Sequence, residues 1–156
     1  MQSIIGGYYA DGLYGFPQDH TKALEFWHRA AELGYAKAYT NIGYAYNNGE
    51  GVVVDKKKAI HYYELAAMGG NVNARYNLGN MKGDAGNTDR ALKHHMVAVE
   101  CGYTPSLERI KDLYSNGHAT KGDYTKALQS YQKYLGEIKS SQRDKAAAAN
   151  DEYRYY

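Results

Sequence analysis

The chain repeats itself with a period of 36 residues. Residues of the same kind recur at this spacing, and the pairs are Asp19 and Asp55, Lys22 and Lys58, Ala30 and Ala66, and Gly34 and Gly70. A fixed period of this size is typical of helical arrays, in which each unit buries its apolar face only by stacking on its neighbours. The repeat therefore predicts an all-α fold. It also lowers the expectation of catalysis, because such arrays usually present surfaces to partners.

The same register continues toward the end of the chain, with one shortening. A basic residue followed by alanine marks each unit, at Lys22–Ala23, Lys58–Ala59, Arg90–Ala91 and Lys126–Ala127. The step from Lys58 to Arg90 is four residues shorter than the other two, because the turn Gly49–Val52 has no counterpart in the third unit. A loss in a turn costs little, whereas a loss inside a helix would rotate its apolar face off the core. We predict four units, at about residues 1–35, 36–71, 72–103 and 104–138, followed by a helical extension or tail at 139–156.

Each unit is predicted to contain two antiparallel helices. In the second unit, apolar residues at helical spacing predict one helix over Ala36–Asn48 and another over Asp55–Met68. Asp55 is the expected N-cap of the second helix, and Asp19 and Asp123 are expected to cap in the same way in their units. We interpret residues 139–156 as a helical extension that covers the last repeat, with a linker to a further domain as the alternative.

Large side chains share one column of the second helices, and they are Trp27, Tyr63, His95 and Tyr131. Small residues such as Gly43 allow the helices to approach closely, and the large rings are expected to fill the spaces left over. His95 is therefore interpreted as a packing residue. A metal site is not expected, because the neighbouring His94 would point about 100° away on a helix.

The residue pattern is fullest in the second unit, where it comprises Ala38, Ile42, Gly43, Tyr46, Gly49, Gly51, Val52, Asp55, Lys58, Ala59, Tyr63, Ala66, Ala67 and Gly70. This pattern resembles the Sel-one-like repeat (SLR), a longer relative of the tetratricopeptide repeat (TPR), over about residues 2–138. The resemblance implies an α-solenoid, a right-handed superhelix of paired helices with a concave binding face. It also implies a non-catalytic scaffold or adaptor that holds other proteins together.

Composition limits the kinds of partner. The net charge is +2, so no strong field favours nucleic acid or an anionic membrane. No segment approaches the roughly 20 apolar residues of a membrane span, and the start of the chain lacks the pattern of a signal peptide. We therefore expect a protein or peptide partner, no nucleic acid, no membrane and a monomeric chain. The single cysteine favours a reducing compartment such as the cytoplasm, although a fragment of a longer protein would leave the location open.

No group of residues predicts a catalytic centre, a cofactor site or a metal site. Cys101 is expected at the end of a helix, where we interpret it as a small buried packing residue. The glycine-rich runs Gly49–Gly51 and Gly83–Gly86 lack the lysine and hydroxyl residue of a phosphate-binding loop. We therefore expect a protein that is not an enzyme.

Two rows of positions on the first helices point away from the predicted core. The first row is Ile5, Asn41, Asn77 and Arg109, and the second is Tyr8, Tyr44, Asn80 and Asp112, with Asn48 on the same face. Tyrosine supplies contact area, and asparagine can donate to and accept from the main chain of an extended peptide. These residues are our predicted partner-binding site on the concave face.

Two other functions remain open. The array could be a structural spacer in a larger protein, or it could self-associate through Tyr153, Tyr155 and Tyr156. It could also resemble a cysteine-rich branch of the SLR family that has been linked to β-lactam binding, as a small-molecule binder or hydrolase. The single cysteine makes that branch a poor match.

Overall fold

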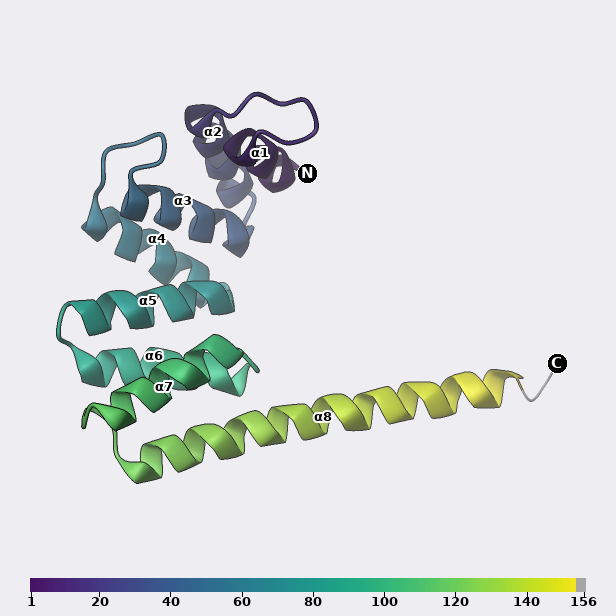
Figure 1. The fold of residues 1–156 in the computed structure, drawn as a ribbon. Coiled ribbons are helices and arrows are strands. Elements are labelled where there is room, and N and C mark those ends of the chain that lie inside the picture. The colour runs from purple at the N-terminus through teal and green to yellow at the C-terminus, as the bar shows by residue number, and fades with distance from the viewer. Residues whose placement is uncertain (154–156) are drawn as a thin grey trace. The chain divides into compact units, whose positions relative to one another are not determined.

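The computed structural model of the chain describes residues 1–153, with side chains described to residue 149. The described residues form helices and no strands (Figure 1). The helices are α1 (Gln2–Asp11), α2 (His20–Glu32), α3 (Ala36–Asn48), α4 (Lys56–Met68), α5 (Val72–Asp84), α6 (Thr88–Glu100), α7 (Thr104–Ser115) and α8 (Lys121–Tyr153). The predicted fold class, an all-α solenoid of helical pairs, is confirmed.

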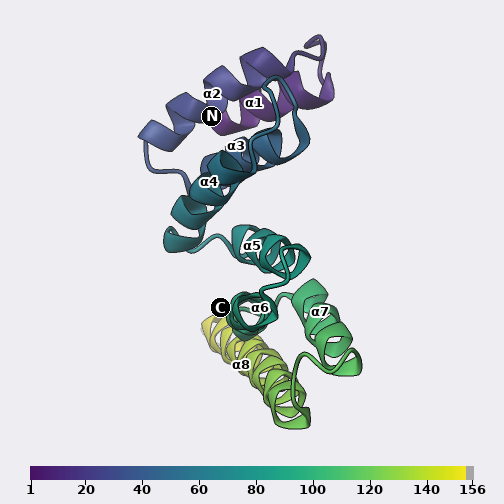
Figure 2. The ribbon, with the colours of Figure 1, turned by 90° about the vertical axis from the view of Figure 1, so that its left-hand side faces the viewer.

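The helices fall into two compact units. Unit 1 covers Met1–Asn87 and contains α1 to α5, and unit 2 begins at Thr88 and contains α6 to α8. Within unit 1, each helix packs on the next one along the chain (Figure 2). In unit 2, α6, α7 and α8 all contact one another. The division between the units lies inside the predicted third repeat, between its two helices.

Helix boundaries in the second repeat agree with the predicted ones. The first helix covers Ala36–Asn48, and Asp55 directly precedes α4. The Asp55 carboxylate accepts a hydrogen bond of 3.0 Å from the backbone N–H of Lys58. Asp19 accepts the same bond, also 3.0 Å long, from Lys22. Both aspartates therefore satisfy a backbone donor that the first turn of a helix leaves unpaired, as an N-cap does.

The prediction that Asp123 is also an N-cap was wrong. Helix α8 already begins at Lys121, and Thr120 holds the capping position. The Thr120 Oγ1 atom accepts a 3.0 Å hydrogen bond from the Asp123 N–H, and the Asp123 carboxylate accepts one of 2.8 Å from the Thr120 N–H. This reciprocal arrangement is a capping box. The backbone and side-chain hydrogen bonds from Thr120 hold the pKa of the Asp123 carboxyl below its ordinary value.

A buried ring packs on a glycine in each of the first two repeats. Tyr63 and Trp27 are 1% and 6% exposed. A Cβ atom on Gly43 would lie 2.8 Å from the Tyr63 ring, and one on Gly6 would lie 2.5 Å from the Trp27 indole nitrogen. Because real side chains do not pack this closely, these glycines allow the first and second helices of a repeat to meet face to face.

The first helices of the two repeats are offset by 37 residues, not by 36. The Asp19 N–H donates to the Tyr9 carbonyl at 2.8 Å, and the Asp55 N–H donates to the Tyr46 carbonyl at 2.9 Å. Tyr9 therefore corresponds to Tyr46, because the turn between α1 and α2 is one residue longer than the turn between α3 and α4. The second helices keep the offset of 36, as their caps show.

In the third repeat, the column that holds Trp27 and Tyr63 is filled by a polar group, the imidazole of His95. His95 is 2% exposed, and its Nδ1 atom lies 3.1 Å from the hydroxyl oxygen of the fully buried Ser106. Its interpretation as a packing residue is confirmed. The prediction that Cys101 is buried was wrong, because this side chain is exposed just beyond the end of α6.

Helix α8 continues well past the part of unit 2 on which it packs. Ala127 is fully buried, whereas residues 136–149 are exposed. In Figure 1, α8 extends far beyond α6 and α7. The predicted continuous helix is confirmed, but its end does not cover the last repeat, because it is too polar to have an apolar face to bury. The side chains of Tyr153, Tyr155 and Tyr156 lie outside the described residues.

Candidate functional site

Two grooves open on unit 1, between its first helices. The α1–α3 groove has a volume of about 650 Å³ and is lined mainly by residues of α1 and α3, with Trp27 of α2. The α3–α5 groove has a volume of about 470 Å³ and is lined by residues of α3, α4 and α5. Tyr44 lines both grooves, so they adjoin at this residue.

The α3–α5 groove combines an apolar floor with side-chain amides. Its amides belong to Asn47, Asn48, Asn77 and Asn80. Ile60, Tyr63 and Met81 supply the apolar surface, and the groove has one lysine, Lys56, and one aspartate, Asp84. Amides can satisfy both the donors and the acceptors of a peptide main chain, while the floor accepts an apolar side chain.

Buried neighbours orient the residues in the middle of this groove. Burial raises the pKa of the Tyr63 hydroxyl, the neighbouring Tyr44 raises it further, and hydrogen bonding from the Asn77 side chain opposes both. The amide of Asn77 thus faces the polar tip of a ring that belongs to the preceding repeat. A side chain held in this way presents its remaining hydrogen-bonding capacity in one direction, which favours specific recognition.

Helix ends shape the wall of the same groove. The Lys56 ammonium group donates two hydrogen bonds of 2.8 Å, one to the backbone carbonyl of Asn47 and one to its side-chain oxygen. The Asn48 amide donates a 3.2 Å hydrogen bond to the Tyr44 carbonyl. The start of α4 is therefore tied to the end of α3.

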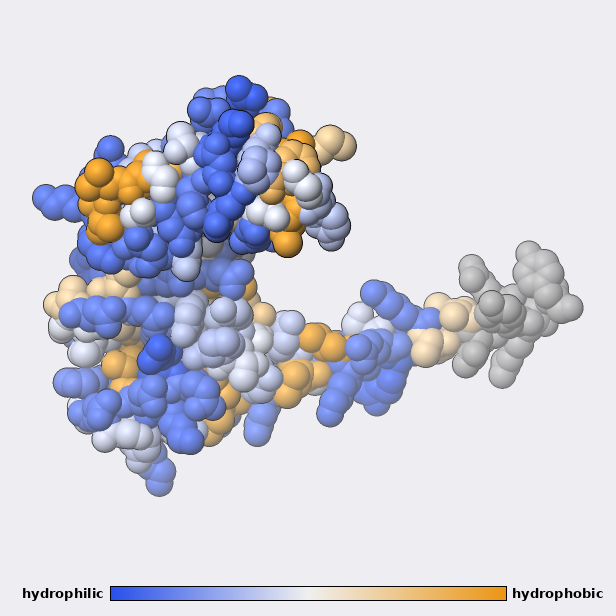
Figure 3. Space-filling model, turned by 45° about the horizontal axis from the view of Figure 1, so that its top comes forward, coloured by the Kyte–Doolittle hydropathy of each residue, from blue (hydrophilic) through white to orange (hydrophobic). Residues whose placement is uncertain are grey.

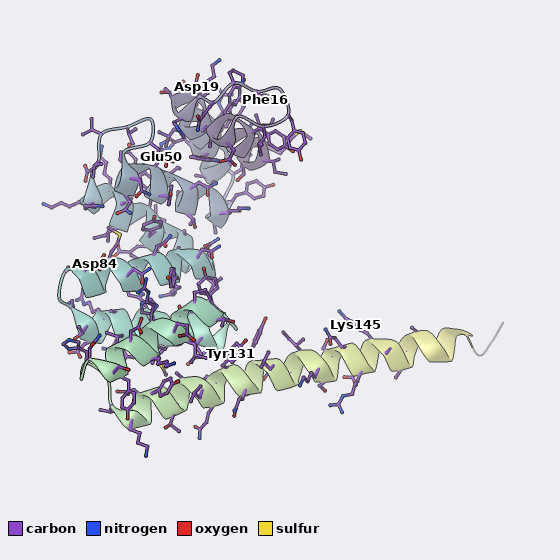
Figure 4. All side chains as sticks on the ribbon, in the orientation of Figure 1. Phe16, Asp19, Glu50, Asp84, Tyr131 and Lys145 are labelled. Carbon is purple, nitrogen blue, oxygen red and sulfur yellow. The ribbon has the colours of Figure 1, made fainter. Side chains whose placement is uncertain are left out.

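The α1–α3 groove has a different chemistry, with aromatic rings and more acidic groups. Its rings are those of Tyr8, Trp27, Tyr35 and Tyr44, and its charged residues are Asp11, Lys37 and Glu50. Glu50 lies in the turn after α3, where Figure 4 labels it, and its carboxylate is 3.9 Å from the Nδ1 atom of His20. That separation is too long for a hydrogen bond.

Six of the nine predicted binding residues line these grooves. The α1–α3 groove contains Tyr8, Asn41 and Tyr44, and the α3–α5 groove contains Tyr44, Asn48, Asn77 and Asn80. Ile5 lines neither groove. The offset of 37 residues gives Ile5 the position of the fully buried Ile42, and it gives Ile4 the position that Asn41 holds in α3. The predicted equivalence of Ile5 with Asn41 was therefore wrong by one residue, and Ile4 lines the α1–α3 groove instead.

Arg109 and Asp112 lie in unit 2, on α7. Both are exposed, and the Arg109 guanidinium is 3.8 Å from the Asp112 carboxylate, one turn further along the helix. Arg109 also contributes to lowering the pKa of His95, although burial is the larger cause. That these two residues continue the rows of the binding site stays a prediction.

Sequence reasoning missed the charged residues at the groove ends. Asp11 and Asp84 end α1 and α5, Lys56 begins α4, and Glu50 lies in a turn. Helical periodicity identifies faces in the middle of helices but says nothing about how turns fold. One signal was available, since a residue next to an N-cap or C-cap lies at the end of its helix and hence near the mouth of an adjoining groove.

Neither a metal centre nor an accessible His95–Ser106 pair is present among the described residues. No group of three or more histidine, cysteine, aspartate or glutamate side chains within them is placed to hold a metal ion. The His95–Ser106 pair resembles a base and a nucleophile, but Ser106 is 0% exposed and no substrate can reach its hydroxyl. None of the described helices is long and apolar enough to cross a membrane.

Comparison with known proteins identifies the repeats. The family model of the Sel1 repeat matches residues 2–35, 36–71, 72–103 and 112–133. Chitin synthase regulatory factor 4 of Schizosaccharomyces pombe is 32% identical over 110 residues, which are 70% of this chain and 17% of that protein. The ERAD-associated E3 ubiquitin-protein ligase component HRD3B of Arabidopsis thaliana is 41% identical over 78 residues, 48% of this chain and 11% of that protein. The chain thus spans less than a fifth of the length of either relative.

Solved structures with the same repeat are similar to the chain over most of its length. A Sel1 repeat protein from Oxalobacter formigenes aligns with a TM-score of 0.71 and 28% identity, over 87% of this chain and 57% of that one. The protein c5321, a protective antigen of uropathogenic Escherichia coli with an SLR fold, aligns with a TM-score of 0.72 and 33% identity, over 87% of this chain and 30% of that one.

Proposed function

Because the chain belongs to the Sel1 repeat family, we propose that it is a non-catalytic adaptor that holds an extended segment of a partner protein in the α1–α3 and α3–α5 grooves. Proteins of this repeat family typically mediate protein interactions. The proposal adds the place of binding and the form of the partner, which is a segment of chain rather than a folded surface.

One observation supports this place above all others. Six of the nine side chains predicted from sequence as binding residues gather in two grooves that meet at Tyr44. An extended peptide rises about 3.3 Å per residue and exposes a donor and an acceptor at each residue. Asn41 and Asn77 of the first row and Asn80 of the second offer matching amides, and the ring of Tyr44 lines both grooves.

The relatives favour an assembly role over a chemical one. Their names describe a regulatory factor and a component of a ubiquitin ligase. This chain matches only a small part of each relative, as expected of a repeat module within a larger protein. For this protein we propose the corresponding role of bringing a partner to a larger assembly.

Selection from a display library of short random peptides tests the proposal directly. We expect the wild-type chain to enrich a set of related peptides, and the synthesised peptides to bind with affinities in the micromolar range. A Tyr44→Ala, Asn77→Ala, Asn80→Ala variant should lose at least about tenfold in affinity, since it removes the shared ring and two amides.

A variant changed on exposed positions of α4, Lys57→Ala with Glu64→Ala, is the matched control and should bind as the wild type does. Circular dichroism should show equal helicity for all three proteins. Equal binding by the groove variant and the control would move the site elsewhere, and a library with no enriched peptide would contradict peptide recognition itself.

A further inference from the structure

The α1–α3 groove places aromatic rings beside carboxylates. Tyr8, Tyr35 and Tyr44 line it together with Asp11 and Glu50, and its basic groups are Lys37 and the amino group of Met1. Figure 3 shows apolar surface at the end of unit 1 formed by α1, next to hydrophilic surface. Rings and carboxylates together form a suitable site for a cationic side chain that also has an apolar or planar part.

Two of these rings are open to a ligand. Tyr44 is 49% exposed and lies in the second half of α3, toward the end that Glu50 follows. Tyr35 is 56% exposed and precedes the start of α3. Tyr8 is half-buried, and its ring is held by the rings of Tyr14 and Phe16, whose centroids lie 4.8 and 5.8 Å away. One wall of the groove is therefore fixed, and the opposite wall offers exposed aromatic faces.

The carboxylates of this groove still have capacity for a partner. Within the described residues no ion pair involves Asp11, and the contact between Glu50 and His20 is 3.9 Å long. Lys37 is exposed on the first turn of α3. In contrast, the α3–α5 groove has one lysine and one aspartate, and the lysine is already bonded to Asn47. The α1–α3 groove has as many basic as acidic groups, but they lie at different ends of its helices. Lys37 and the amino group of Met1 are at the starts of α3 and α1, whereas Asp11 ends α1 and Glu50 follows the end of α3, so the negative charge is local to that end.

We propose that the α1–α3 groove binds an arginine side chain of the partner segment. The segment then continues past Tyr44 into the α3–α5 groove, where a neighbouring apolar side chain of the partner lies on Ile60 and Met81. This inference rests on the proposed function and specifies the chemistry of the partner. A planar guanidinium group stacks on tyrosine faces and donates several hydrogen bonds to carboxylates at the same time, which a lysine ammonium group cannot do as well. The partner is thus an extended, basic and apolar segment.

The test uses the peptides selected in the display experiment above. Each peptide is synthesised with its arginine and again with citrulline, a neutral residue of nearly the same shape, and affinities for the wild-type chain are measured by fluorescence anisotropy. We expect arginine among the enriched residues, and a loss of about tenfold or more on replacement by citrulline.

Two variants separate a local effect from a general one. Asp11→Asn should weaken the arginine peptide and leave the citrulline peptide unchanged, because only the charge interaction is removed. Tyr44→Leu should weaken both peptides, and the arginine peptide more. Glu64→Gln, at an exposed position of α4 that lines neither groove, is the matched control and should leave the ratio of arginine to citrulline affinity as it is in the wild type.

The outcomes distinguish this inference from the proposed function. Enriched peptides that bind through Asn77 and Asn80 but show equal affinity with arginine and citrulline would overturn the arginine site and leave the adaptor function intact. Enrichment of acidic peptides would do the same. If no peptide is enriched, the proposed function fails, and the arginine site fails with it.

Discussion

Unit 1 and unit 2 fill the same column of the fold with different chemistry. In unit 1, Trp27 and Tyr63 are buried rings that lie on glycines of the first helices. In unit 2, the half-buried Tyr131 holds this column in the last repeat, and the buried His95 holds it in the repeat before. His95 is hydrogen-bonded to Ser106, which replaces the alanines at equivalent positions of the earlier repeats. One unit is therefore held at this point by apolar contact and the other by a buried polar pair.

The difference shows which property the repeat needs at this column. A large planar group that fills the space between the helices is present in every case, and its polarity varies. Burial of a polar group has a cost unless its hydrogen bonds are made, and Ser106 supplies one such bond to His95. Unit 2 retains the packing, but it also acquires a titratable group in its core.

The largest expected effect is a loss of stability of unit 2 when the pH is lowered. Burial lowers the pKa of His95 to about 4, with smaller contributions from Arg109 and His94. An unfolded chain binds a proton at this residue near pH 6.5, so between pH 6.5 and 4 the unfolded state holds more protons than the folded state. The stability of unit 2 should therefore fall as the pH is lowered through this range, by up to about 3 kcal/mol, and this residue should contribute nothing further below pH 4.

A comparison of variants isolates the contribution of His95 from that of the carboxylates. His95→Tyr with Ser106→Ala introduces the residue types found at Tyr63 of the second repeat and Ala74 of the third. Urea unfolding at pH 7 and 4.5 should show a smaller loss of stability on acidification in this variant than in the wild type. His61→Gln, at an exposed position, is the control. Equal acid sensitivity of the wild type and the double variant would mean that His95 does not act as proposed.

The second prediction concerns the glycines of unit 1. Gly43→Ala and Gly6→Ala should each lower the free energy of unfolding by about 1–3 kcal/mol, because the added methyl group overlaps a buried ring that has no room to move. Gly7→Ala has nothing within 4 Å of the new Cβ atom, and should stabilise α1 by about 0.5–1 kcal/mol. Fluorescence of Trp27, the one tryptophan of the chain, reports unfolding of unit 1.

Gly6 and Gly7 also test the register of α1. An offset of 36 residues would make Gly7 the equivalent of Gly43, whereas the structure assigns that position to Gly6. A destabilising Gly7→Ala with a neutral Gly6→Ala would reverse this assignment and restore Ile5 to the predicted row.

Much of the fold could be predicted from the sequence because it follows from a period. The spacing of apolar residues and the local hydrogen bonds both repeat along the chain. They determine the bounds of α3, the caps Asp19 and Asp55, and the packing role of His95. The exposure of Cys101 could not be predicted in this way, since it lies beyond the end of α6 where the apolar pattern stops.

The candidate site was predictable only where it follows the same period. Asn41, Tyr44, Asn77 and Asn80 were found because they lie at matching positions in the middle of helices. Ile5 was misplaced because an extra residue in the turn after α1 shifts the whole helix, and a single-residue shift rotates a helical face by about 100°. Glu50 and Asp84 were not predicted as groove residues, because the turns at the helix ends differ in length and conformation between repeats.

The smallest expected effect distinguishes the caps of the two units. Asp19→Ala and Asp55→Ala each remove one side-chain cap in unit 1 and should each cost about 1 kcal/mol, with nearly additive effects in the double variant because the two caps belong to different helices. In unit 2, Thr120→Ala should cost a similar amount, and so should Asp123→Ala. The unit 2 effects should not add, because either change breaks the same reciprocal pair. Thermal unfolding of the four single and two double variants shows, for each unit, whether the two single losses of stability add up to the loss in the double variant.

Additivity between Thr120 and Asp123 would mean that the two residues stabilise α8 independently, with Asp123 acting through its charge near the helix start.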